Sequence, residues 1–78
     1  MNRILPVKLP VWHSANGEVI ACVEKLKVMQ DNLQELVQMA QDAFEDAILM
    51  GCDENQVRTY LVDLMKALEN PYCSSRVS

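Results

Sequence analysis

A single unbroken run of apolar residues at heptad spacing, from Val19 to Met50, constrains this chain more than any other feature. The spacings alternate between three and four, and neither proline nor glycine interrupts residues 18–50. This period places the apolar side chains along one side of an α-helix. The positions are Val19, Cys22, Leu26, Met29, Leu33, Leu36, Ala40, Ala43, Ala47 and Met50. We therefore predict a long first helix over residues 17–50, ended by Gly51 in the left-handed conformation.

A second helix is expected after a turn of two or three residues. Asp53 suits the N-cap, because Gln56 follows three residues later, and Asn70-Pro71 ends the helical pattern. Between them the apolar residues recur at helical spacing: Val57, Tyr60, Leu61, Leu64, Met65 and Leu68. We predict this helix over residues 53–69 and a flexible tail over residues 70–78. A short turn makes two helices antiparallel neighbours, so the expected fold is an all-α, antiparallel two-helix hairpin.

The first sixteen residues have a different character. The prolines at positions 6 and 10 favour extended backbone, so we expect an extended N-terminal arm over residues 1–16. Asn16-Gly17 then fits two structures: a β-hairpin turn within residues 11–23, or the N-cap of the first helix. We favour the helix start because the heptad-spaced residues begin at Val19, and the hairpin remains the alternative.

The length of the chain limits what it can bury by itself. Its 78 residues form one small domain, and the second helix is long enough to cover only the second half of the first. An apolar stripe is left on the first half, and it needs either the arm or a second copy of the chain to cover it. Dimerisation into a helical bundle is the simplest closed arrangement. The predicted interface residues are Trp12, Val19, Cys22, Val23, Leu26, Met29 and Leu33.

The net charge and the cysteines indicate which kinds of partner and which cellular compartment to expect. Eleven acidic residues against seven basic ones give a net charge of −4, which argues against nucleic acid as the partner. No apolar run is long enough to span a membrane. Three cysteines leave at least one unpaired, and the N-terminus has no secretory pattern, so we expect free thiols in the cytoplasm.

Residues able to carry chemistry are few. No pair among His13, Cys22, Cys52 and Cys73 has the spacing of a zinc site, and two glycines cannot form a phosphate-binding loop. We therefore expect neither an enzyme nor a cofactor. The sequence predicts a non-enzymatic protein-interaction or adaptor module that binds another protein and forms a homo-oligomer. The alternative is a small protein that handles thiols or metals through Cys22, Cys52 or His13.

Overall fold

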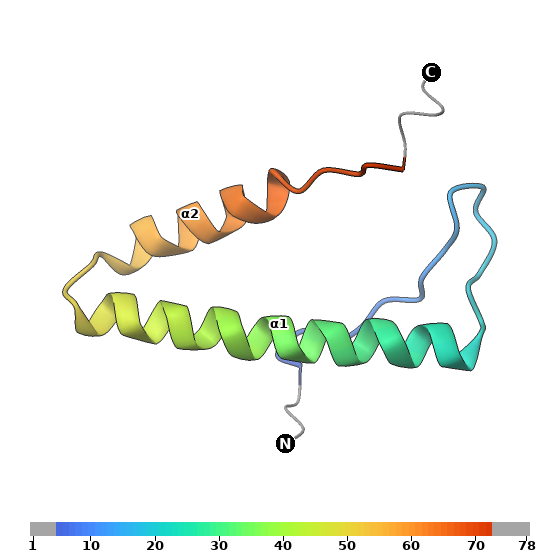
Figure 1. Cartoon of the computed structure of the whole chain (residues 1–78), viewed down its shortest axis with the longest axis horizontal. Helices are drawn as coiled ribbons and strands as arrows, with labels where there is room; N and C mark the ends of the chain where they lie inside the picture. Colours follow the sequence, from blue (N-terminus) through green and yellow to red (C-terminus); the bar gives the residue numbers. More distant parts are fainter. Residues whose placement is uncertain (1–4, 73–78) are drawn as a thin grey trace. The chain divides into compact units, whose positions relative to one another are not determined.

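The computed structural model describes residues 5–72, which contain two α-helices, α1 (Val23–Leu49) and α2 (Glu54–Lys66). A short turn joins the end of α1 to the start of α2 (Figure 1). No strand is present in this part of the chain, apart from one isolated antiparallel bridge between His13 and Val19. The prediction of an all-α chain with two helices is confirmed. The first four residues of the predicted arm, most of the predicted tail and Cys73 lie outside the described residues.

The chain divides into two compact units, Met1–Ala43 and Phe44–Ser78, and α1 runs from the first into the second. The first unit contains the arm, a short hairpin and most of α1. The second contains the last turns of α1, the interhelical turn and α2. The prediction of a single domain over residues 1–78 stays a prediction.

The first helix begins at Val23, so the predicted start at residue 17 is wrong. Residues 12–20 form a short antiparallel hairpin instead (Figure 1). The amide of Ile20 donates to the carbonyl of Trp12 over 2.9 Å, and the amide of Ser14 donates to the carbonyl of Glu18 over 2.8 Å. These bonds hold the β-branched residues Val19 and Ile20 in extended backbone, which such residues favour.

The hairpin loop explains why the helix cannot start earlier. Gly17 has a φ of +91°, outside the helical region, and its amide donates to the carbonyl of Ser14 over 2.9 Å. A turn closed in this way, with glycine in the left-handed region before the returning strand, is the usual three-residue hairpin loop. The Ser14 hydroxyl also accepts the amide of Glu18 at 3.2 Å and contacts the Asn16 side chain. Asn16 and Gly17 therefore form the turn of the hairpin and do not cap the helix.

The end of α1 follows the prediction. Gly51 has a φ of +97°; its amide donates to the carbonyl of Ile48, and the amide of Cys52 donates to the carbonyl of Ala47, each over 3.0 Å. This pair of bonds is the Schellman motif, which satisfies carbonyls that the helix leaves without partners. The left-handed glycine at the helix end is confirmed.

The second helix is shorter than predicted. Asp53 is its N-cap, with a carboxylate oxygen that accepts the amide of Gln56 over 2.9 Å. The helix ends at Lys66, with Ala67 as its C-cap, so residues 67–69 do not continue it. The backbone tightens there, because the amide of Ala67 also donates to the carbonyl of Leu64 and the amide of Leu68 donates to the carbonyl of Met65, each three residues earlier.

Burial is the feature that separates this chain from an ordinary small domain. No residue from 5 to 72 is buried, whether apolar or polar. The hairpin alternates instead: Trp12, Ser14 and Ile20 are partly buried, whereas His13 and Val19 are exposed. Neither unit therefore contains a fully covered hydrophobic core within the described residues.

Candidate interaction surface

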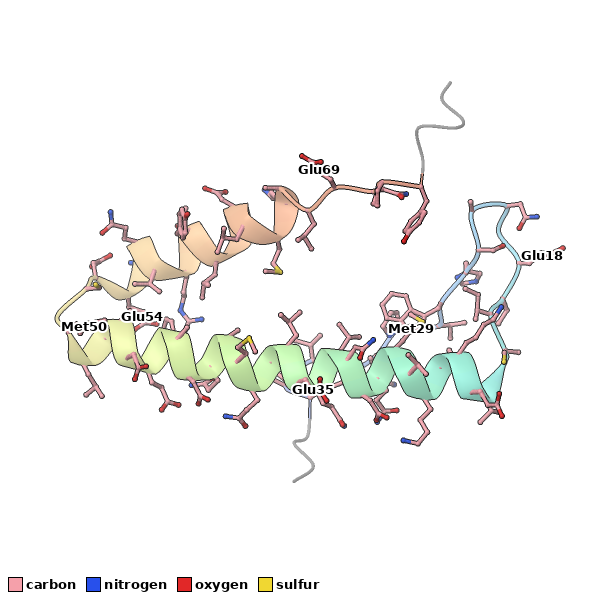
Figure 2. The ribbon with its side chains drawn as sticks, in the orientation of Figure 1. Glu18, Met29, Glu35, Met50, Glu54 and Glu69 are labelled. Carbon is pink, nitrogen blue, oxygen red and sulfur yellow. The ribbon has the colours of Figure 1, made fainter. Side chains whose placement is uncertain are left out.

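The structure separates the predicted interface residues into three groups. Trp12 and Val19 lie on the hairpin, Cys22 precedes the first residue of α1, and the remaining four lie on α1. Figure 2 shows the side chains along α1, with Met29 labelled. On the helix Leu26, Met29 and Leu33 are partly buried, whereas Val23 is 77% exposed. The predicted interface is therefore not one continuous helical surface, because Trp12 and Val19 belong to the hairpin and Cys22 precedes α1.

In the first unit, the partly buried side chains of α1 lie on one side of the helix, and some of them are polar. Gln34, Gln38 and Gln41 are partly buried together with the apolar residue Val37. Leu5 and Leu9 of the arm are partly buried as well, whereas Val7 and Val11 are 75% and 66% exposed. This pattern fits the arm as partial cover inside the unit, which the sequence offered as one of two candidates.

The other side of α1 carries apolar side chains that are left open. Val28 is 58% exposed, Leu36 42% and Met39 72%, and Ala43 is also exposed. At 3.6 residues per turn these four residues fall within about 80° of one another around the helix axis. We call them the open flank. Sequence reasoning missed Val28 and Met39 because they are not on the heptad seam; their positions relative to Leu36 around the axis were the available signal.

Cys22 occupies the N-cap of α1, because its carbonyl accepts the amide of Leu26 over 3.0 Å. A hydrogen bond from the backbone N–H of Lys25 lowers the pKa of the thiol. Partial desolvation opposes this effect, and the N–H of Glu24 and the charge of Lys25 lower the pKa further. The prediction placed Cys22 on the apolar seam of a helix, whereas the structure leaves it exposed at the helix end. The lowered pKa increases the fraction of thiolate, which is the reactive form of the side chain.

His13 and Cys52 are the other residues that the sequence offered for thiol or metal chemistry. His13 lies on the hairpin opposite Val19, and Cys52 is an exposed free thiol in the interhelical turn. Within residues 5–72, no three histidine, cysteine or carboxylate side chains are grouped closely enough to hold a metal ion.

In the second unit, an aromatic–cation contact joins the end of α1 to α2. The guanidinium carbon of Arg58 lies 4.6 Å from the centre of the Phe44 ring, and its Nε donates to Glu54 over 2.9 Å. Phe44, Val57 and Leu61 are partly buried there, whereas Leu68 is 73% exposed. Contacts of this kind hold the last turns of α1 to α2 without closing a hydrophobic core.

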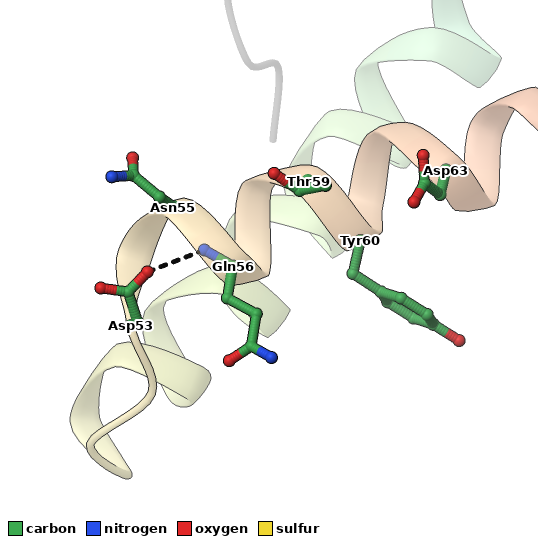
Figure 3. Close-up of a pocket in the computed structure, with 6 residues that line it drawn as sticks. All are labelled: Asp53, Asn55, Gln56, Thr59, Tyr60 and Asp63. Carbon is green, nitrogen blue, oxygen red and sulfur yellow. Dashed lines mark hydrogen bonds between the residues drawn. The ribbon is translucent and has the colours of Figure 1, made fainter.

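A shallow hollow lies along α2 (Figure 3). Its lining residues are Asp53, Asn55, Gln56, Thr59, Tyr60 and Asp63. The Tyr60 ring is 63% exposed, and Asp53 is already engaged as the helix cap. Tyr60 therefore presents its ring to solvent, although the sequence placed it with the apolar residues of the helix.

Some side chains pair within one helix. Lys27 pairs with Asp31 at 2.8 Å, Gln38 donates to Asp42 at 2.9 Å, and Arg58 pairs with Glu54, each pair four residues apart on one helix. Such pairs contribute about 0.3–0.5 kcal/mol each and support the helices in which they lie.

No family model matches this chain, and neither the curated proteins nor the solved structures contain a match to it. In the described part of the chain, no helix combines the length and the apolar character needed to cross a membrane.

Proposed function

We propose that the chain is a non-enzymatic protein-interaction module that acts as a small helical homo-oligomer. The observation that carries the proposal is the absence of any buried residue from 5 to 72 in a sequence that is 50% hydrophobic. A chain of this size needs most of its apolar surface covered to offset the entropy of folding. A second copy or another protein supplies the missing cover.

The exposed apolar residues support an interface in both units. Met39 in the first unit is 72% exposed, and Leu68 in the second is 73% exposed. Exposed apolar residues that gather on one face of a soluble protein mark contact surfaces more often than chance exposure does. A cytoplasmic location and partners other than nucleic acid or membranes belong to the same proposal.

Light scattering of the full chain across a concentration series tests self-association. We expect a dimer or larger species at tens of micromolar, shifted toward monomer by Leu26→Glu combined with Met29→Glu. Val62→Glu is the matched control, because Val62 is a half-exposed helical residue outside the predicted interface. A stable wild-type monomer at these concentrations contradicts the proposal.

The thiol alternative is a second candidate, favoured by one specific observation. Cys22 is exposed and its pKa is lowered by the N-terminus of α1. We expect a Cys22→Ala, Cys52→Ala, Cys73→Ala variant to self-associate as the wild type does. Stoichiometric zinc, nickel or iron in the wild type, absent from this variant, would favour the thiol or metal function instead.

A further inference from the structure

We propose that the open flank of α1 binds the α1 helix of a second copy, and that the two helices run antiparallel. The inference rests on the proposed function, because it names the surface and the orientation through which the module self-associates. It differs from the sequence prediction in its residues, because the contact surface consists of Val28, Leu36, Met39 and Ala43. None of these four belongs to the interface predicted from the sequence.

The first step of the argument is exposure. Leu26, Met29 and Leu33 are partly buried, whereas Met39 is 72% and Val28 58% exposed. A shallow apolar hollow lies at the N-terminal end of the flank, lined by Glu24, Lys25, Val28 and Met29. A partner therefore finds uncovered apolar surface on the flank.

The second step is the charge distribution along α1. The basic residues of this helix, Lys25 and Lys27, lie in its first two turns, whereas Asp42, Glu45 and Asp46 lie near its end. Both placements oppose the helix dipole, which favours anions at the N-terminus and cations at the C-terminus. Around the helix axis, Lys25 and Asp46 fall on the same side of α1 as the open flank. A neighbouring helix on this flank that runs the opposite way brings Lys25 of one copy beside Asp46 of the other. A parallel neighbour in register would place carboxylates beside carboxylates.

The third step is the match of side chains in such a pair. If the two-fold axis passes between Leu36 and Met39, Leu36 of one copy faces Met39 of the other. The hollow beside Val28 then lies next to the last turn of the second copy's α1. With this axis, Lys25 faces Met50 of the second copy. Asp46 lies four residues, or about one helical turn, from Met50, so Lys25 lies within reach of it. The contact is self-complementary, as a two-fold interface requires.

Zero-length carbodiimide cross-linking of the wild-type chain tests the orientation without any substitution. Within one α1 helix, Lys25 and Asp46 are separated by 21 positions, about 31 Å along the axis at 1.5 Å per residue. A cross-link between them therefore joins two copies, and an equimolar mixture of isotopically light and heavy protein confirms this by mass spectrometry. Lys27 and Asp31, paired at 2.8 Å, supply the intrahelical positive control.

We expect mixed-isotope cross-links from Lys25 to Asp46, their loss in Met39→Glu, and no change in Val62→Glu. Circular dichroism verifies that Met39→Glu, at a largely exposed position, keeps its helices. A dimer whose inter-copy links join Lys25 only to Glu24 is parallel and overturns the inference while leaving the proposed function intact. A dimer undiminished by Met39→Glu overturns it as well. A monomeric wild type removes both proposals.

Discussion

Gly51→Ala is the substitution whose effect the structure defines most closely. Gly51 ends α1 with a φ of +97° and donates its amide to the carbonyl of Ile48, next to the bond from Cys52 to Ala47. An added Cβ would meet no atom within 4 Å, so the substitution creates no clash. The cost is therefore purely conformational.

Its magnitude follows from two opposing terms. Placing an L-residue in the left-handed region costs roughly 1–2 kcal/mol. Alanine also restricts the unfolded chain, which offsets about 0.4–1 kcal/mol of that cost. We expect a net loss of about 1 kcal/mol in the free energy of unfolding, and a melting temperature lower by about 4–8 °C for a chain of this size.

The assay is urea denaturation followed by circular dichroism at a fixed protein concentration, because association changes the apparent stability. Gly51→Asn should lose less, because asparagine tolerates the left-handed region. Met50→Ala, at an exposed neighbour with negative φ, is the control for side-chain loss. A neutral or stabilising Gly51→Ala would refute the Schellman turn as the end of α1.

Three further outcomes follow from local contacts. Gly17→Ala should destabilise the hairpin by about 1 kcal/mol, because Gly17 also has a positive φ, and amide exchange at Ser14 and Ile20 should speed up; unchanged exchange would contradict the hairpin. Asp53→Ala should cost about 1 kcal/mol through loss of the α2 cap, with Asp53→Asn near the wild type, as measured by thermal melting; equal losses in both variants would argue against the cap. Alkylation of Cys22 should reach half its maximal rate at a lower pH than alkylation of a free cysteine, because the lowered pKa keeps more thiolate present as pH falls, and urea should abolish this difference; a profile that urea leaves unchanged would show that the helix end has no effect.

The residues around the interhelical turn show where sequence reasoning works well. Gly51, Asp53 and Gln56 act through bonds to atoms a few positions away, and the preferences of each residue type for such bonds do not depend on the rest of the fold. The C-terminus of α2 differs by about one turn for an equally local reason. The amides of Ala67 and Leu68 donate to carbonyls three residues earlier, so the helix tightens and ends before Asn70-Pro71, the stop signal in the sequence.

The start of α1 shows where sequence reasoning fails. Asn16-Gly17 is compatible with both a helix cap and a hairpin turn, and Val19 fitted the heptad spacing by position alone. The choice depends on whether Trp12 and Ile20 pair across the loop, which is a contact between residues eight positions apart. Periodicity describes which side of a helix a residue would occupy and carries no information on that pairing.

The sequence by itself determined that this chain forms two helices, where α1 ends and how α2 is capped, because these features depend on backbone preferences and hydrogen bonds within one or two turns. Tertiary structure decided which apolar residues remain exposed. Leu26 and Met39 are both apolar residues of the same helix, yet the first is partly buried and the second is 72% exposed. Exposure depends on which segments pack against each side of α1, and the arm and hairpin pack through long-range contacts that no local pattern specifies.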